Sequence, residues 1–238
     1  MEEKVSGIVV GGVNYGENDK ILSVFTLEQG VVSAKIKGVK KAGAKLKFVA
    51  EPFCFAQIIF SKNGKMRTVI NASLIDSFYP LRTDLTRYFC GGTVVEYVKK
   101  FVKESILSPD LFILTANTLK QLAYGDLAPE GVLVDFLIKA LAFSGYALKS
   151  DGCFTCNKPI PDRVYFDYVY GGFFCEDCKT QDCREINPDT YLTIQECEKG
   201  NIPNSLSAVK PLRLLDYYMK AKADVNLKSL GELLAMSK

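Results

Sequence analysis

Residues 153–178 read CFTCNKPIPDRVYFDYVYGGFFCEDC. This segment holds two C-x2-C pairs, Cys153 with Cys156 and Cys175 with Cys178, separated by 18 residues. Between the pairs, Arg163–Phe174 contains an apolar run, a Gly-Gly dipeptide and two phenylalanines, which predicts a β-hairpin. A hairpin of that length brings the two pairs together, and each pair turns its thiols toward one point.

A metal ion is the expected occupant of this cluster. Four converging thiolates form the tetrahedral ligand set that Zn²⁺ prefers, so we predict one structural zinc ion held by both cysteine pairs. Four thiolates leave no open coordination position for water or substrate, so the metal is not expected to be catalytic. An iron–sulfur cluster, a redox-active C-x2-C pair and four unliganded thiols are the alternatives. The redox alternative is weakened because two matched pairs are present without a βαβ pattern around either.

The chain has four more cysteines, since the total is eight. Cys54 and Cys90 are expected to be small core residues. Cys183 and Cys197 lie outside the two C-x2-C pairs and are expected to be spare thiols, which are not needed as metal ligands. The spacing leaves open whether Cys183, five residues after Cys178, replaces one of the ligands.

The composition excludes several classes of enzyme. The 238 residues are 48% hydrophobic and 24% charged, the balance of a globular protein. The absence of His excludes a Ser-His-Asp or Cys-His catalytic pair and a His-bearing zinc site. Gly11–Gly16 and Gly38–Gly43 have G-x4-G spacing but lack the Lys-Ser/Thr that a phosphate-binding loop needs. We therefore expect that the protein is not an enzyme.

The cellular compartment influences whether the cysteines form disulfides or bind metal. The start Met1-Glu2-Glu3-Lys4 lacks the features of a signal peptide, and no apolar stretch approaches the roughly 20 residues of a membrane span. We expect a cytoplasmic protein. In that reducing compartment disulfides are disfavoured, which supports metal binding by the paired cysteines.

In the first third of the chain, the apolar residues follow the pattern of short β-strands. Short runs rich in Val, Ile and Phe, separated by Gly- and Asn-bearing turns, lie at 5–13, 20–26, 31–37, 52–60 and 66–75. Five such runs predict an OB-type β-barrel over residues 1–80. Asn63-Gly64 is the strongest hairpin signal, because a type I′ turn needs positive φ at both central residues. In the third run, the alternation assigns Val32, Ala34 and Ile36 to the core and the lysines to the outer face.

After Pro80 the apolar period changes to that of helices. Helical spacing covers residues 81–104, 111–124, 129–148, 207–221 and 227–236. Gly91-Gly92 in the first stretch indicates a kink or a close helix contact. The sequence thus predicts an α+β multidomain chain. It comprises an OB-type barrel (1–80), a helical domain in two parts (81–150 and 187–238) and the four-cysteine zinc ribbon inserted between them (151–186).

A lysine-rich segment follows the third apolar run. Residues 31–50 hold no acidic residue and six lysines, namely Lys35, Lys37, Lys40, Lys41, Lys45 and Lys47. A solvated face is the plain explanation. Three features favour contact with nucleic-acid phosphates instead. The segment starts on a strand, it continues through a Gly-containing loop, and it belongs to a class of barrel that binds single-stranded nucleic acids. Residues 1–80 also hold 11 basic against 7 acidic side chains, and Tyr15 is the best exposed candidate for base stacking.

The order of these features resembles the bacterial recombination mediator RecO family over nearly the whole chain. The residues that carry the resemblance are Gly7–Val10, Tyr15–Lys20, Val24–Thr26 with Gly30, Lys37-Gly38, Glu51–Phe53, Phe78–Arg82 with Asp84-Leu85, Gly145-Tyr146 ahead of Cys153, and Leu227–Ser229. Their order and spacing together, rather than any single motif, point to the family.

The resemblance implies a non-enzymatic DNA-repair protein. Members of that family bind single- and double-stranded DNA, promote annealing, join the mediator RecR and engage the C-terminal tail of the single-stranded DNA-binding protein SSB. Together they help load the recombinase RecA onto coated strands, and some members lack the four-cysteine set, which fits a structural zinc. The protein is then expected on the nucleoid when bound to DNA. An acidic, apolar tail would suit a groove between helices near basic residues such as Arg82, Arg87, Lys99 and Lys100.

The alternative is a zinc-ribbon RNA-binding or transcription-associated protein, in which the ribbon itself is the contact surface. Residues 151–186 hold 4 basic against 7 acidic side chains, which argues against the ribbon as a primary phosphate binder. A redox protein, the third possibility, would need a low-pKa thiol and would work without metal.

Overall fold

The computed structural model describes residues 2–62, 66–203 and 208–236. The chain divides into two compact units, Met1–Ala123 and Tyr124–Lys238, which we call the barrel unit and the ribbon unit. The predicted Asn63-Gly64 turn lies outside the described residues. None of the helices among the described residues is long and apolar enough to cross a membrane.

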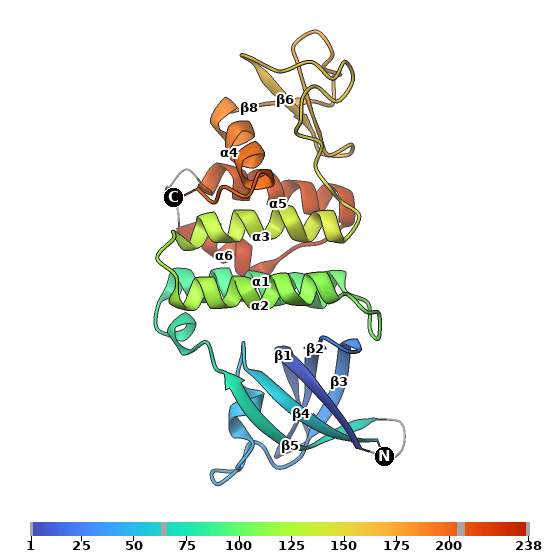
Figure 1. Cartoon of the computed structure of the whole chain (residues 1–238), viewed down its shortest axis with the longest axis vertical. Coiled ribbons are helices and arrows are strands. Elements are labelled where there is room, and N and C mark those ends of the chain that lie inside the picture. Colours follow the sequence, from blue (N-terminus) through green and yellow to red (C-terminus); the bar gives the residue numbers. More distant parts are fainter. Residues whose placement is uncertain (1, 63–65, 204–207, 237–238) are drawn as a thin grey trace. The chain divides into compact units, whose positions relative to one another are not determined.

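Five strands close the barrel, as the alternation predicts. They are β1 (Glu2–Tyr15), β2 (Asp19–Thr26), β3 (Gly30–Ile36), β4 (Phe55–Lys62) and β5 (Arg67–Asp76). Their order around the barrel is β1-β2-β3-β5-β4 (Figure 1), with β3 and β5 parallel and the other neighbours antiparallel. This closed five-stranded barrel is OB-like and confirms the predicted fold of the N-terminal part.

The long strand β1 belongs to two sides of the barrel. Glu2–Ile8 pair with β4, whereas Gly7–Tyr15 pair with β2. The register shifts between Val9 and Gly11, and such a β-bulge bends the strand. The bend allows one strand to pair on both sides, and the pairing of Ala34 and Lys35 with Arg67 and Thr68 closes the sheet into a barrel.

Alternating side chains fill the barrel. Val32, Ala34 and Ile36 of β3 are at most 1% exposed, while Lys35 between them is half-buried on the outer face. Leu22 of β2 and Phe60 of β4 belong to the same buried cluster. The predicted division of β3 into a core face and a lysine face is confirmed.

The first long helix begins later than its apolar spacing predicts. The residues after Pro80 form the end of a 3₁₀ turn, η2 (Tyr79–Arg82), and α1 spans Leu85–Phe101. The Asp84 carboxylate caps α1 by accepting a hydrogen bond from the Arg87 N–H at 2.7 Å. This cap fixes the start of the helix.

Gly91 inside α1 marks a close contact. The helix runs without interruption through Gly91, and a Cβ on Gly91 would lie 3.3 Å from Phe53 and 3.2 Å from Leu81. On the other helix of this unit, α2 (Pro109–Tyr124), Phe112 packs edge-on against Phe25 of the barrel with ring centroids 5.3 Å apart. Aromatic packing therefore joins the helices to the barrel.

Gly30 begins β3 in a crowded place with positive φ (+68°). Val31 bridges to Glu104 in the segment after α1, and a Cβ on Gly30 would lie 2.0 Å from the carbonyl oxygen of Ile106. Gly30→Ala must therefore shift the backbone as well as strain φ. We expect the free energy of unfolding to fall by at least about 3 kcal/mol, measured by chemical denaturation.

Two other glycines provide the controls for Gly30→Ala. Gly16 also has positive φ (+63°) but has nothing within 4 Å of its Cβ position, and Gly43 is equally open without positive φ. Gly16→Ala isolates the cost of φ, about 1–2 kcal/mol, and Gly43→Ala is expected to be nearly neutral. Equal losses for Gly30→Ala and Gly16→Ala would contradict the close approach to Ile106.

The ribbon unit contains four helices and a small sheet among the described residues. The elements are α3 (Pro129–Phe143), β6 (Val164–Asp167), β7 (Gly172–Phe174), β8 (Arg184–Ile186), α4 (Pro188–Glu198), α5 (Val209–Ala223) and α6 (Lys228–Met236). The sheet has the order β7-β6-β8, with β6 antiparallel to both neighbours. The predicted hairpin is confirmed, and β8 adds a third strand that the pattern does not predict.

Two helices of this unit differ from the sequence expectation. α3 ends at Phe143 rather than at residue 148, because the chain turns at Gly145 with φ +82°. α4 is absent from the predicted helices. Its start carries a recognisable signal, because Asn187 caps the helix by accepting from the Asp189 N–H and Pro188 occupies the first turn.

Candidate metal centre and nucleic-acid surface

The first cysteine knuckle is a tight turn after the chain passes Lys149. Cys153 donates its N–H to the Lys158 carbonyl at 2.9 Å, and the Cys153 carbonyl accepts from the Asn157 N–H at 2.8 Å. Asn157 adopts the left-handed conformation (φ +59°) that closes the turn. The turn therefore carries Cys153 and Cys156 on a fixed backbone.

The second knuckle starts directly after β7. The Cys175 carbonyl accepts hydrogen bonds from the N–H groups of Cys178 and Lys179, at 3.2 and 3.1 Å. The Cys175 N–H in turn points at the Cys153 sulfur, 3.5 Å away. A backbone N–H directed at a ligand sulfur stabilises a thiolate there.

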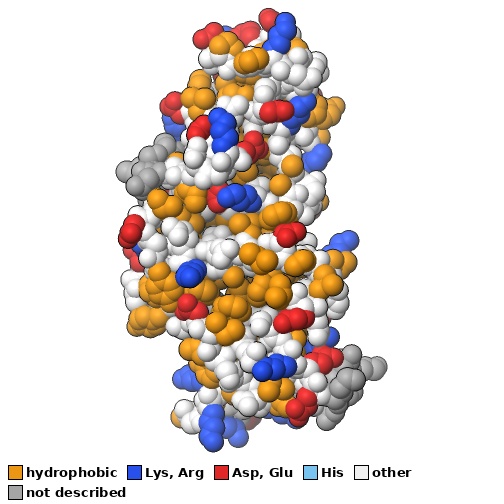
Figure 2. Space-filling view, in the orientation of Figure 1, with side chains coloured by type: hydrophobic (Ala, Val, Ile, Leu, Met, Phe, Trp, Pro, Cys, Tyr) orange, Lys and Arg blue, Asp and Glu red, His pale blue; other side chains and the backbone are white. Residues whose placement is uncertain are grey.

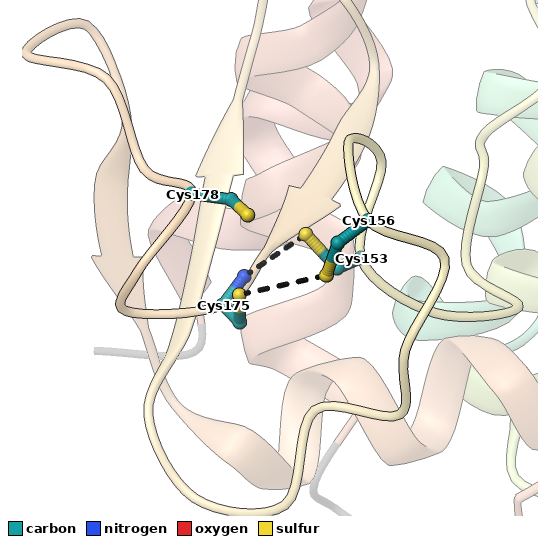
Figure 3. A group of neighbouring side chains, drawn as sticks. All are labelled: Cys153, Cys156, Cys175 and Cys178. Carbon is teal, nitrogen blue, oxygen red and sulfur yellow. Dashed lines mark hydrogen bonds between the residues drawn. The ribbon is translucent and has the colours of Figure 1, made fainter.

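The four sulfurs converge (Figure 3). All four ligand atoms lie within 4.8 Å of one another, and the Cys156 and Cys175 sulfurs are 4.0 Å apart. A regular tetrahedron with Zn–S bonds of about 2.3 Å has edges of about 3.8 Å, so the observed spacing suits an ion of that kind. The cluster contains sulfur donors only, which is the chemistry of a structural zinc site.

The thiols of the cluster influence each other strongly. Burial alone would raise the pKa of Cys153, but backbone N–H groups of Cys156, Cys175 and Thr155 lower it to about 6. The neighbouring cysteine sulfurs, Cys175 first, raise the pKa of Cys178 to about 12. Without a metal, Cys178 therefore stays protonated near neutral pH, whereas a divalent cation at the centre of the four sulfurs favours the thiolate form.

The remaining cysteines stand apart from the cluster. Cys183 is 9% exposed and packs against Tyr165 and Phe174, outside the group of converging sulfurs. Cys54 and Cys197 are at most 1% exposed, and burial raises their pKa values to about 11 and about 12. Cys90 is fully buried. All four thiols are packed in the interior, as predicted for Cys54 and Cys90.

The sheet that carries the knuckles is also packed against helices of the same unit. Phe173 of β7 contacts Tyr191 of α4 with ring centroids 4.8 Å apart, and Phe166 of β6 contacts Tyr218 of α5 at 5.9 Å. The other face of the sheet carries Tyr165 and Phe174 toward the knuckles. Order around the cysteines is therefore linked to order in the helical core of this unit.

Two of the four basic residues of the ribbon, Arg163 and Lys179, form ion pairs with carboxylates of the ribbon. Arg163 lies 3.3 Å from Glu176 and 3.5 Å from Glu185, and Lys179 lies 2.8 Å from Glu176. Figure 2 shows acidic and basic side chains mixed at the upper end, where Figure 1 draws β6 and β8. These two basic residues are engaged with carboxylates, which weakens the ribbon tip as a phosphate-binding surface.

Lys35 is held differently from the other lysines of the 31–50 segment. Its ammonium forms an ion pair with Asp19 at 2.8 Å and lies 4.4 Å from the centre of the Tyr15 ring. Hydrogen bonds from Lys35 and from the Gly38 N–H lower the pKa of Asp19. The sequence pattern missed Asp19, which orients Lys35 and fixes the start of the lysine loop; we use that name for residues 37–47.

The lysine loop is ordered by its backbone and leaves its charges free. The Lys40 N–H donates to Asn18, and turns close from Lys41 to Gly38 and from Lys47 to Ala44. Buried Val39 and Val49 anchor the two ends. Five lysines are exposed and, among the described residues, form no side-chain hydrogen bond or ion pair; they are Lys37, Lys40, Lys41, Lys45 and Lys47.

Other candidate side chains have definite places. Tyr15 is 49% exposed and stands beside Lys35, as suits a stacking residue. Arg82 donates to the carbonyls of Pro52 and Ser77, and Arg87 donates to the Leu122 carbonyl. These two guanidinium groups are thus occupied in part by backbone contacts, which weakens the expectation of a peptide groove around them.

The chain is similar to known proteins along most of its length. The family models "Recombination protein O N terminal" and "Recombination protein O C terminal" match residues 1–78 and 82–231. A DNA repair protein RecO of Acetivibrio thermocellus is 31% identical over 179 residues, covering 75% of this chain and 71% of that protein. Another, of Caldicellulosiruptor saccharolyticus, is 32% identical over 186 residues, covering 77% and 75%. A third, of an Exiguobacterium species, is 29% identical over 237 residues, covering 96% and 94%.

Proposed function

This chain belongs to the recombination protein O family, and from that premise we propose that it is a non-enzymatic recombination mediator. A role in DNA repair follows from the family, whose similar members are named DNA repair proteins. Our proposal goes further. The protein binds single- and double-stranded DNA, promotes strand annealing, and together with RecR helps load RecA on single strands coated with SSB.

One observation carries the DNA-binding part of this proposal. The lysine loop presents five exposed ammonium groups without side-chain partners on an OB-like barrel. Lysines supply position-tolerant charges that suit a phosphate backbone better than a base sequence. Lys35 contributes less in this proposal, because Asp19 already neutralises it, and it serves to orient the Tyr15 ring.

The zinc ion has a structural role in the proposal. Cys153, Cys156, Cys175 and Cys178 would hold one Zn²⁺, which adds rigidity and leaves no open coordination position. The ribbon then keeps its sheet in place against α4 and α5. Protein partners, RecR and the C-terminal tail of SSB, belong to the proposal through the family resemblance, as does a place on the nucleoid in the cytoplasm.

Equilibrium binding tests the proposed function. The full-length protein is titrated into labelled single-stranded and duplex oligonucleotides over a series of salt concentrations. We expect binding to both, with a plot of log K against log salt for the single strand falling with a slope of about −3 or steeper, as for four or more phosphate contacts. Absence of binding at low salt would contradict the proposal.

A further inference from the structure

A small pocket lies in the ribbon unit where its sheet meets two helices. Its volume is about 190 Å³, and Ile186 and Leu214 are the apolar residues of its lining. Tyr168 after β6, Asn187 and Thr190 of α4, and two basic residues of α5 complete the lining. The pocket is separate from the cysteine cluster and from the lysine loop.

Basic side chains surround this pocket without acidic partners. Lys210 and Arg213 line it, and no carboxylate does. Burial and the nearby Tyr217 raise the pKa of Tyr168, and the charge of Arg184, which does not line the pocket, opposes that rise. Among the residues that the structure describes, Lys210, Arg213 and Arg184 form no ion pair. Two cations without ion-pair partners in the lining of one pocket favour an anion.

Neutral donors at the pocket also lack acceptors. Thr190 is only 3% exposed, yet its hydroxyl forms no hydrogen bond among the described residues. Asn187 uses its side-chain oxygen to cap α4, so its amide N–H groups stay available as donors. The Thr190 hydroxyl and the Asn187 amide are therefore available to donate to a ligand in the pocket.

We propose that this pocket binds a phosphate group of a nucleic-acid strand, with Lys210, Arg213 and Thr190 as its principal contacts. The inference rests on the proposed DNA-binding function and adds a second contact to that of the lysine loop. Guanidinium, ammonium, hydroxyl and amide donors together match the several oxygens of a phosphate. Beside the pocket, Tyr217 is 59% exposed and its ring lies 6.2 Å from that of Tyr168, which offers an aromatic face to an adjoining base.

Substitution of the two cations tests this inference. In the full-length protein, Lys210→Ala combined with Arg213→Ala is expected to weaken binding of a single strand of about 20 nucleotides about tenfold at low salt. The salt slope should become shallower by about 0.7, the value for one phosphate. Thr190→Val, which keeps the shape but removes the hydroxyl, should weaken binding to a smaller extent. Lys120→Ala combined with Lys222→Ala removes the same charge at two exposed positions outside the pocket and should have little effect.

The lysine-loop variant described in the Discussion separates the possible outcomes. If the pocket variant binds DNA like the parent while the loop variant does not, this inference is overturned and the proposed function stands. If both variants bind like the parent, both proposals fail. Loss of an acidic peptide from the pocket variant with unchanged DNA binding would make the pocket a peptide site, which also overturns the inference.

Discussion

Cys175→Ala is expected to abolish stoichiometric zinc binding, leaving the purified protein with far less than one ion per chain. The substitution removes one of four sulfurs that lie within 4.8 Å of each other, and three thiolates cannot complete a closed tetrahedral site. Structural zinc sites contribute apparent binding free energies of about 10–16 kcal/mol in small zinc-finger peptides, so a lost ligand is a large perturbation. Metal analysis by mass spectrometry measures the outcome.

The loss of zinc should also change the stability of the ribbon unit. We expect faster amide hydrogen exchange first in the knuckles and then in β6 and β7, since Phe166 and Phe173 of these strands pack on Tyr218 and Tyr191. The barrel has its own closed sheet and buried core, and its protection should persist. Binding of the ion displaces thiol protons, so zinc affinity should fall as the pH is lowered.

Cys183→Ala is the matched control for Cys175→Ala. Cys183 is a buried cysteine close to the cluster, but its sulfur is not among the converging ligands. This variant should keep one zinc ion per chain and lose a modest amount of stability from a small cavity. Loss of zinc from the Cys183 variant, with retention in the Cys175 variant, would show that the ligand set is wrong.

Replacement of four exposed lysines should remove most of the DNA affinity. In the loop variant, Lys37, Lys40, Lys41 and Lys45 are changed to alanine. If each contacts one phosphate, the salt slope for single strands becomes shallower by about 3, and affinity at low salt falls on the order of 100-fold. Fluorescence anisotropy with a labelled oligonucleotide measures both quantities.

A second quadruple variant controls for the change in net charge. Lys103, Lys120, Lys158 and Lys222 are exposed and lie outside the lysine loop, so their replacement by alanine removes equal charge elsewhere. This control variant should keep most of the DNA affinity and most of the salt slope. Equal effects of the two variants would mean that net charge, rather than the loop, determines binding. Lys35→Ala alone should have a small effect on phosphate contact, because Asp19 pairs with Lys35.

Local patterns predict the parts of this fold whose neighbours are close in sequence. The alternation of Val32, Ala34 and Ile36 is enough to identify β3, and the C-x2-C spacing is enough to place four sulfurs together. The start of α1 depends on the Asp84 cap, a signal of one residue that the apolar period does not carry. Local apolar patterns therefore predict the presence of helices and strands better than they predict where these elements begin and end.

Long-range contacts decide what the patterns miss. β8 exists because residues 184–186 pair with β6 some twenty residues earlier, and such a short strand has no period of its own. The partner of Lys35 comes from Asp19 on the neighbouring strand, so a count of lysines overstates the free charge by one. The pocket beside Tyr168 joins α4, α5 and the sheet, and its lining is scattered from residue 168 to 214.

The rate at which complementary single strands anneal, with and without an SSB coat, tests the central proposal most directly. Two labelled oligonucleotides are mixed at low salt with the parent protein, the loop variant or its charge-matched control. A recombination mediator should accelerate annealing of bare and coated strands, and the loop variant should lose that acceleration while the control keeps it. No acceleration by the parent protein on either substrate would contradict the account.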